Sequence, residues 1–391
     1  MKSVRDIEVT SKKIFVRVDY NVPVDEELNI TDDNRILETL DLIRYLVEQH
    51  AKIILASHMG RPKGKRDPKF SLATVCKRLS QLLDKPVLFA DDCIGDEVAK
   101  MVSQLNDGQI LLLENLRFHG QEEKNDDIFS KKLAALCDVY VNDAFAVSHR
   151  NQASVTGVPR FVKESAAGFL LEKEMQAYHD SVENPKRPLV AIIGGAKVSS
   201  KLDALENMLK FVDKMIIGGA MANTFLKSQG VDTKGSMIEE DLLDTAAGIV
   251  QTAAEKGVAF LLPEDLVCAD KFDKDAQVKE VLVDQIPDQW MALDIGPKTA
   301  LRYAKAIEEA GTVVWNGPMG VFEMGKFISG TRIVAEAIAA SFAFSIVGGG
   351  DTGLAAKKCN VADKVSYVST GGGAFLHLME GKKLPGVVAL E

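Results

Sequence analysis

Arginine and histidine side chains follow the predicted strands in the first half of the chain. They are Arg35, Arg61, Arg117, Arg150, His58 and His149. The planar guanidinium group binds a carboxylate or a phosphate through paired hydrogen bonds. Ligands of parallel α/β sheets bind beyond the carboxyl ends of the strands. The pattern therefore predicts, at one end of one domain, a site for a small ligand with several negative charges.

A structural explanation of these residues stays open. Each arginine could pair with a nearby carboxylate, such as Asp19, Glu114 or Asp143. This explains one arginine more easily than four at corresponding strand ends. His58 is interpreted as a loop histidine or a substrate contact in preference to a phosphate acceptor. Asp19 could orient the arginines, accept a hydrogen bond from a substrate hydroxyl or act as a base.

The second half has glycine runs after four predicted strands. The runs are Gly194-Gly195-Ala196-Lys197, Gly218-Gly219-Ala220, Gly348 to Thr352 and Gly371 to Gly373. Glycine lets the backbone approach a ligand closely, and the N-terminus of a following helix offers free N–H groups to phosphates. One such run could merely let a helix cross a strand tightly, but four are harder to explain in that way. Lys197 and Lys201 add positive charge, and Asp351 is a candidate oxygen ligand for Mg²⁺.

The glycine runs also occur in other nucleotide-binding proteins, such as dehydrogenases and non-catalytic binding proteins. Residues 348–353 fit G-x-G-x-x-G after a strand, which on its own would favour an NAD-dependent dehydrogenase. No Asp or Glu follows at about 20 residues, where the ribose contact is expected. No P-loop motif is present either. A non-catalytic nucleotide-binding protein would keep the glycine runs but would not need the arginine cluster.

Short apolar runs alternate with amphipathic segments, which is typical of parallel strands covered by helices on both faces. Strands are predicted at 14–18, 52–56, 87–90, 110–113 and 139–141, and then at 189–193, 214–217, 259–262, 312–315, 344–347 and 364–368. Helices are predicted at 35–48, 72–83, 96–105 and 128–136, and then at 201–211, 241–255, 299–310 and 333–340. The two series predict two doubly wound, Rossmann-like α/β domains with parallel sheets.

Length and composition agree with two domains. The chain has 391 residues, and single cores stop growing at about 250–300. It is 46% hydrophobic and 26% charged, which excludes a disordered chain. A net charge of −9 argues against nucleic-acid and anionic-membrane binding. The five scattered cysteines form no metal-ligand spacing, and no secretory signal or membrane span is predicted, so we expect a soluble, cytoplasmic protein.

The boundary between the domains is expected at a long helical run. We predict an N-terminal domain at 1–168, a connector helix at 169–187 and a C-terminal domain at 188–377. Pro185 and Pro188 end the connector because proline disfavours helical backbone in the residue before it.

In order and spacing, eight motifs resemble those of the phosphoglycerate kinase family over essentially the whole chain. They are VRVDYNVP at 16–23, SHMGRP at 57–62, ENLRF at 114–118, VNDAFAVSHR at 141–150, GGAKVSSKL at 194–202, WNGPMGVFE at 315–323, GGGDT at 348–352 and STGGGA at 369–374. The resemblance implies reversible, Mg²⁺-dependent transfer of the acyl phosphate of 1,3-bisphosphoglycerate to ADP by a monomer. It also implies that residues 378–391 return to the N-terminal domain. Phe375 and His377 depart from the family pattern after STGGGA, which bears on domain closure more than on the chemistry.

The resemblance also implies roles for individual residues. The triose acid would contact Asp19, Asn21, Arg35, His58, Arg61, Arg117 and Arg150. The nucleotide would contact Lys197, Lys201, Gly219, Asn316, Glu323, Gly349, Gly350, Asp351 and Thr352, with Asp351 the magnesium ligand.

The mechanism expected from these residue types needs no general base. In the direction of ATP use, the nucleophile is a carboxylate that is already ionised, so catalysis requires alignment and neutralisation of charge. Arg35 and Lys197 are the candidates for that task, with backbone N–H groups at Gly372 and Gly373 as further donors. Because the two predicted sites lie in different domains, we expect hinge closure when both ligands are bound.

Overall fold

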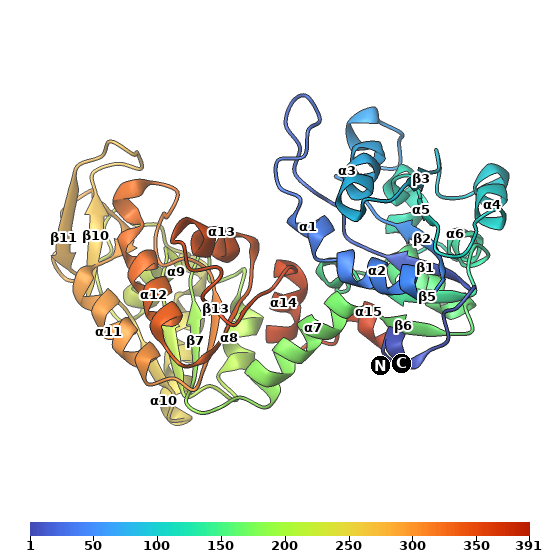
Figure 1. Cartoon of the computed structure of the whole chain (residues 1–391). Coiled ribbons are helices and arrows are strands. Elements are labelled where there is room, and N and C mark those ends of the chain that lie inside the picture. The colour runs from blue at the N-terminus through green and yellow to red at the C-terminus, as the bar shows by residue number, and fades with distance from the viewer. The chain divides into compact units, whose positions relative to one another are not determined.

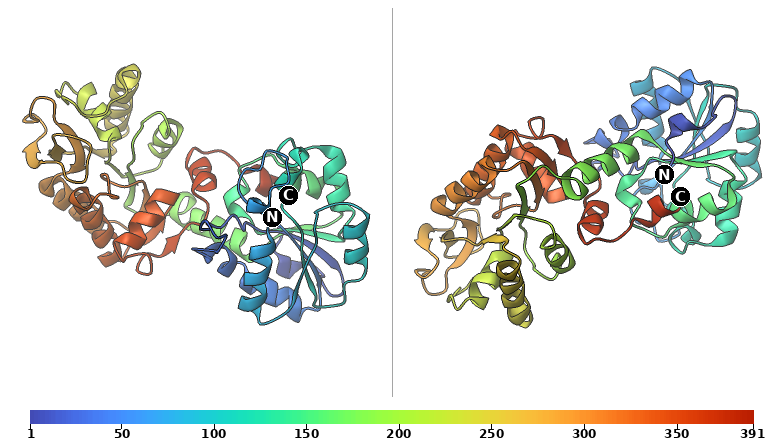
Figure 2. Two further views of the ribbon diagram at one scale, coloured as in Figure 1. Left: turned by 90° about the horizontal axis from the view of Figure 1, so that it is seen from above. Right: turned by 90° about the horizontal axis from the view of Figure 1, so that it is seen from below.

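Two groups of residues pack separately in the computed structural model, which describes residues 1–391. The first unit comprises Met1–Met175 together with Lys383–Glu391, and the second comprises Gln176–Lys382. Both termini belong to the first unit, and the views in Figures 1 and 2 place them side by side. No helix in the chain has both the length and the apolar character that crossing a membrane requires.

The first unit contains a six-stranded parallel sheet in the order β3-β4-β2-β1-β5-β6. The strands are β1 Lys13–Arg17, β2 Lys52–Ala56, β3 Val87–Phe89, β4 Ile110–Leu112, β5 Val139–Asn142 and β6 Ser165–Ala167. The register pairs Arg17 with Ala56 and with Asn142, so β1, β2 and β5 end at one level. The segments after these three strands therefore begin at a common edge of the sheet.

Helices of the first unit are α1 Asn34–Leu37, α2 Leu40–Glu48, α3 Ala73–Leu83, α4 Asp96–Ser103, α5 Gly120–Glu123, α6 Asp127–Ala134 and α15 Pro385–Val388. The single helix predicted over 35–48 is wrong, because the chain breaks between α1 and α2. At the break, Thr39 Oγ1 donates to the Ile36 carbonyl at 2.8 Å and lies 2.9 Å from the buried Tyr20 hydroxyl. A threonine that serves as a local turn residue is hard to distinguish from a helical one by apolar spacing.

The second unit contains another six-stranded parallel sheet, in the order β15-β14-β13-β7-β8-β9. Its strands are β7 Leu189–Ile193, β8 Lys214–Ile217, β9 Ala259–Leu261, β13 Thr312–Asn316, β14 Phe344–Val347 and β15 Tyr367–Val368. Its helices are α8 Leu202–Met208, α9 Met221–Ser228, α10 Leu243–Glu255, α11 Pro297–Glu308, α12 Ser329–Ala340, α13 Gly350–Lys358 and α14 Gly372–Met379. The predicted pair of doubly wound parallel sheets is confirmed.

A three-stranded antiparallel sheet in the second unit was not expected from the sequence. It consists of β10 Asp265–Ala269, β11 Val278–Leu282 and β12 Met291–Ile295, with β10 in the middle. The middle strand is buried along its length, whereas β11 is mostly exposed and carries Lys279 and Glu280. An exposed edge strand lacks the continuous apolar run that identifies a buried parallel strand.

The segment between the two sheets is helical. Helix α7 spans Phe169–Tyr178 and continues as a π-helical turn at His179–Glu183. The Asp143 carboxylate accepts the N–H groups of Leu170 and Leu171, at 2.7 and 3.2 Å, and so caps the start of α7. Burial raises the pKa of Asp143 to about 7.

The C-terminal segment packs into the first unit. Gly386 donates its N–H to the Ser148 carbonyl at 2.8 Å, and its own carbonyl accepts from Asn142 at 3.2 Å. Leu384 and Leu390 are buried beside these contacts. The last nine residues thus pack against the first unit, with Leu384, Gly386 and Leu390 buried in it.

We expect Leu384→Ala to lower the free energy of unfolding of the first unit by about 2–5 kcal/mol, since truncating a buried leucine removes apolar contacts and leaves a cavity. Leu384 is 1% exposed, whereas Val388, in the same segment, is 44% exposed. The control Val388→Ala should therefore change the stability by no more than about 0.5 kcal/mol. Urea unfolding followed by circular dichroism measures both variants, and equal stabilities would contradict a structural role for the segment.

Candidate active site

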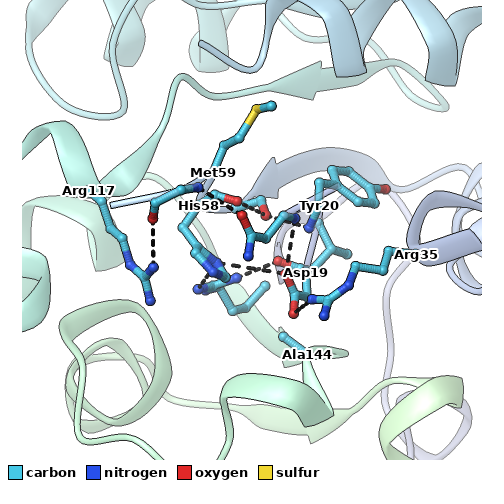
Figure 3. A network of polar contacts seen from close by, with 12 residues as sticks. Asp19, Tyr20, Arg35, His58, Met59, Arg117 and Ala144 are labelled. Carbon is cyan, nitrogen blue, oxygen red and sulfur yellow. Dashed lines mark hydrogen bonds and ion pairs between the residues drawn. The ribbon is translucent and has the colours of Figure 1, made fainter. Parts of the chain in front are cut away.

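Asp19 lies at the centre of a polar network beyond the carboxyl ends of β1 and β2 (Figure 3). Its Oδ1 accepts the Asn21 N–H at 3.1 Å, and its Oδ2 is ion-paired with Arg35 on α1. Burial acts to raise the pKa of Asp19, but the basic side chains around it hold the pKa below its usual value. Asp19 is therefore a carboxylate that orients Arg35, one of the roles left open by the sequence.

His58 is held in one tautomer by a neighbouring arginine. Its Nδ1 lies 3.2 Å from Nη2 of Arg17. A guanidinium group can only donate, so Nδ1 accepts and the proton of the neutral ring is on Nε2. Burial lowers the pKa of His58 well below its usual value; Asp19 only partly offsets this, and arginine charges lower it further. His58 is thus neutral at pH 7 and can offer a hydrogen-bond donor.

Arg17 is a site residue that the sequence analysis did not select. It is completely buried, and its Nε donates to Ser154 Oγ at 2.8 Å. Ser154 in turn donates to the buried Glu122 carboxylate at 2.5 Å. A charged residue inside the otherwise apolar run at 14–18 was the available signal, because a buried arginine requires partners.

The Arg117 side chain is buried with much of its donor capacity unused. Its Nη1 donates to the Gly60 carbonyl at 2.8 Å, and Asn21 accepts the Gly60 N–H at 2.8 Å. Nε lies 3.8 Å from a Glu123 oxygen, too far for a hydrogen bond, and neither Nε nor Nη2 has a hydrogen-bond partner. Burial and the charges of nearby arginines lower the pKa of Arg117 to about 10. Buried donors of this kind fit an anionic ligand.

The remaining arginines are placed differently. Arg150 is half-buried, and its charge lowers the pKa of both His58 and Arg117. Arg61 is exposed beside Gly60. Of the suggested carboxylate partners, only Asp19 pairs with one of these four arginines. Glu114 accepts instead from Ser71 and from the N–H of Leu72, and Asp143 caps α7.

In the second unit, the N-termini of α13 and α14 meet. A Cβ on Gly372 would lie 2.9 Å from the Gly349 Cα and 3.0 Å from the Gly350 nitrogen. Gly349 also has φ +103°, which side chains rarely adopt. Glycine therefore lets the N-terminal N–H groups of two helices, which lack acceptors within their own helix, converge at one place. Phe375 on α14 packs over Gly348 and leaves no room for a side chain there.

Lys201, Asn316 and Thr352 connect the strand ends around these helices. Lys201 Nζ donates to the carbonyls of Gly194 and Asn316, at 2.6 and 2.8 Å. The Asn316 amide donates to the Gly348 carbonyl at 2.9 Å, and Thr352 Oγ1 accepts the Gly317 N–H at 2.7 Å. Burial lowers the pKa of Lys201 to about 8, against the opposing charge of Asp351. The predicted residues Lys201, Asn316, Gly349 and Thr352 are thus brought together.

The other predicted nucleotide contacts are spread more widely. Gly219 packs on the backbone of Gly195, so a side chain would not fit there. Lys197 is exposed in the loop after β7, and Asp351 is exposed in the first turn of α13. Glu323 is exposed, and its carbonyl accepts from Lys358 in the last turn of α13 at 3.0 Å. The Glu323 backbone therefore lies at the C-terminal end of α13, whereas the free N–H groups are at its N-terminal end.

Comparisons with known proteins agree over the whole chain. The phosphoglycerate kinase family model matches residues 4–382. A phosphoglycerate kinase of Desulforapulum autotrophicum is 65% identical, and one of Desulfotalea psychrophila is 57% identical, each over 100% of both chains. The solved structure of phosphoglycerate kinase from Coxiella burnetii has a TM-score of 0.91 at 44% identity and covers 99% of this chain and 98% of its own. That from Pyrococcus horikoshii has a TM-score of 0.85 at 32% identity, with coverage of 100% and 98%.

The lowered pKa of His58 predicts how the stability of the protein depends on pH. Its pKa is lowered in the folded state, so below about pH 6.5 the unfolded chain binds a proton that the folded chain does not. Stability contributed by the neutral ring is therefore lost as the pH falls. Between about pH 6.5 and about pH 5.5, the free energy of unfolding of the wild type should fall by about 1 kcal/mol more than that of His58→Gln.

Urea unfolding of the wild type and of His58→Gln at the two pH values measures this difference. The control His50→Asn alters an exposed histidine with φ 58°, which asparagine tolerates, and it should retain the wild-type pH dependence. If His58→Gln loses as much stability as the wild type on acidification, His58 is not the group responsible.

Proposed function

The chain belongs to the phosphoglycerate kinase family, and from this membership we propose how its two units divide the reaction. The enzyme transfers the acyl phosphate of 1,3-bisphosphoglycerate to ADP, reversibly, giving 3-phosphoglycerate and ATP. The first unit binds the triose acid, and the second binds the nucleotide. The dehydrogenase and the non-catalytic alternatives are not favoured, because the family match extends over nearly the whole chain.

The observation that supports the assignment of the first unit is Arg117. Its Nε and Nη2 are buried and lack hydrogen-bond partners. A carboxylate or phosphate oxygen would satisfy them and offset the mutual repulsion of Arg117, Arg17 and Arg150. His58 adds a neutral N–H donor, and Asp19 with Asn21 holds the surrounding loops. Arg61, exposed beside Gly60, belongs to the same proposed set because of its place in the family motif.

The nucleotide assignment rests on the converging N-termini of α13 and α14. N–H groups at helix N-termini suit phosphate oxygens, and the half-buried Lys201 adds a positive charge next to Gly194. Gly219, Asn316, Thr352 and Glu323 complete the proposed set.

Asp351 is the proposed magnesium ligand. Its exposed carboxylate stands in the first turn of α13. One or two carboxylates together with phosphate oxygens are the usual ligands of nucleotide-bound Mg²⁺, so this position fits the ion. When bound, Mg²⁺ neutralises charge on the phosphate oxygens during transfer.

Neutralisation of the transferring group is assigned to Arg35 and Lys197. Arg35 is held by Asp19 yet remains about one-third exposed, and Lys197 is exposed in its loop, so both cations can reach an anionic ligand. The N–H groups of Gly372 and Gly373, in the first turn of α14, are further donors. The attacking carboxylate is already ionised, so no base is required.

We further propose that the enzyme is a cytoplasmic monomer. All five cysteines are unpaired, which suits a reducing compartment. A single chain contains both proposed ligand sets. Hinge closure stays a prediction.

Arg35→Ala should lower kcat by roughly 10²–10³-fold, the scale of losing one donor to a transition state, with little change in the Kd of ADP. Steady-state kinetics and calorimetry measure the two quantities. The control Arg44→Ala removes an exposed arginine of α2 that pairs with Asp41, and it should leave kcat unchanged. A variant at position 35 that retains most of its kcat would remove Arg35 from the mechanism.

Asp351→Asn should weaken binding of Mg·ADP much more than binding of metal-free ADP, because a charged oxygen ligand is lost. Titration calorimetry with and without Mg²⁺ measures both affinities. Asp363→Asn, at an exposed position beyond α13, is the control and should alter neither. Equal weakening of both ligands by Asp351→Asn would show that the carboxylate does not contact the metal.

A further inference from the structure

Three side chains that the phosphoryl-transfer site does not use form a separate cluster in the first unit. Asp92 and Cys93 lie in the loop between β3 and α4, and His119 lies directly before α5. His119 Nε2 is 2.6 Å from Asp92 Oδ1. One ligand atom from each of the three residues lies within 4.8 Å of the other two. The fold thus brings together a thiol, an imidazole and a carboxylate from two distant segments.

This combination selects a particular class of ion. Thiolate and imidazole ligands favour Zn²⁺ over Mg²⁺ or Ca²⁺, and a carboxylate is an accepted further ligand. Zinc sites with three protein ligands leave the fourth tetrahedral position to water. Since Zn–S and Zn–N distances are about 2.3 and 2.0 Å, ligand atoms in such a site stand roughly 3.5 Å apart. His119 Nε2 and Asp92 Oδ1 are 2.6 Å apart, a hydrogen-bond distance, so metal binding would replace this hydrogen bond and separate the two atoms by about 1 Å.

We propose that Asp92, Cys93 and His119 form a Zn²⁺-binding site. In the metal-bound state, Asp92 and Cys93 would carry two negative charges that match the cation, with the Cys93 thiol releasing its proton to solvent as the metal binds, and His119 would supply a ring nitrogen. This inference does not depend on the residue roles proposed for phosphoryl transfer.

The surroundings hold the three side chains in place. The His119 ring packs against Phe129 with centroids 5.3 Å apart, which restricts its orientation. Cys93 is completely buried, whereas the Asp92 side chain is 45% exposed and offers the ion a route from solvent. Glu122 is close enough to influence the Cys93 thiol, but both its oxygens are bonded to Ser154. The site therefore has three protein ligands and an open side.

Metal binding would link the segment that carries Arg117 to the loop after β3. His119 is two residues beyond Arg117, within the turn that follows β4. An ion held by Asp92, Cys93 and His119 would fix this turn to the loop after β3. Binding to the folded state alone also stabilises it, so the melting temperature of the full-length protein should rise with Zn²⁺.

Cobalt is a suitable probe because Co²⁺ takes the same ligands and absorbs light. Titration of the full-length, nucleotide-free protein should give one equivalent of bound Co²⁺ with a thiolate-to-cobalt charge-transfer band, and Zn²⁺ should displace it. Cys93→Ser should abolish that band and weaken Zn²⁺ binding at least ~100-fold, because losing a partner that only orients a ligand already costs 10–100-fold. Competition with a chromophoric chelator measures the affinity.

Matched controls separate this cluster from other sites. Cys76→Ser removes another buried cysteine of the first unit and should leave the band intact. His119→Gln should weaken Zn²⁺ binding as Cys93→Ser does. His179→Gln, which disrupts an exposed His–Glu pair with Glu183, should not. Asp92→Asn, with its exposed side chain, provides a further variant should one of the others fail to fold.

Two results would overturn the proposal. One is a Co²⁺ spectrum without a thiolate band. The other is Zn²⁺ affinity that survives both Cys93→Ser and His119→Gln; its loss in His179→Gln would then place binding at the exposed pair.

Discussion

The buried guanidinium of Arg17 is the interaction on which the first unit's site depends. Burying a charge without partners is far too costly for a folded protein, so the N–H groups of Arg17 need hydrogen-bond acceptors around them. Ser154 accepts a hydrogen bond from Arg17 and donates one to Glu122, and His58 accepts one at Nδ1. One cation thereby sets the hydroxyl direction of a serine, the tautomer of a histidine and the position of a buried carboxylate. Asp19, two residues further along the chain, is ion-paired with Arg35.

The same region concentrates positive charge beyond what its carboxylates balance. Arg117 is buried near Arg17 and Arg150, which lowers its pKa to about 10, and two of its donor atoms have no hydrogen-bond partner. Unpaired buried donors destabilise a protein. The arrangement is understandable if an anionic ligand supplies the missing acceptors. Binding then removes the penalty of the unpaired donors, and the free energy released contributes to the affinity for the ligand. Sites of this kind exchange stability for function.

Strand positions could be predicted from the sequence because buried parallel strands are continuous apolar runs, as at Leu189–Ile193 and Lys52–Ala56. Elements that depend on tertiary contacts could not, and β11, an exposed edge strand, is one of them. The order of motifs also indicated which segments meet at the sheet edges. It did not indicate side-chain direction: Asp143 follows β5 and was one of the possible arginine partners, yet it caps α7. Arg17 was missed because its role comes from burial, which strand-end counting ignores.

Under the proposed division of the reaction, the two units bind anions by different physical means. The first uses charged side chains, whose burial must be compensated by a network of fixed acceptors. The second uses backbone N–H groups, which carry no net charge and need only close approach; glycines at 349 and 372 permit it. The half-buried Lys201 donates to the carbonyls of Gly194 and Asn316 and so holds the strand ends that position the loops. Charged side chains suit a small acid with several full negative charges, and converging helix N–H groups suit phosphate oxygens. Each unit therefore matches the charge distribution of its proposed ligand.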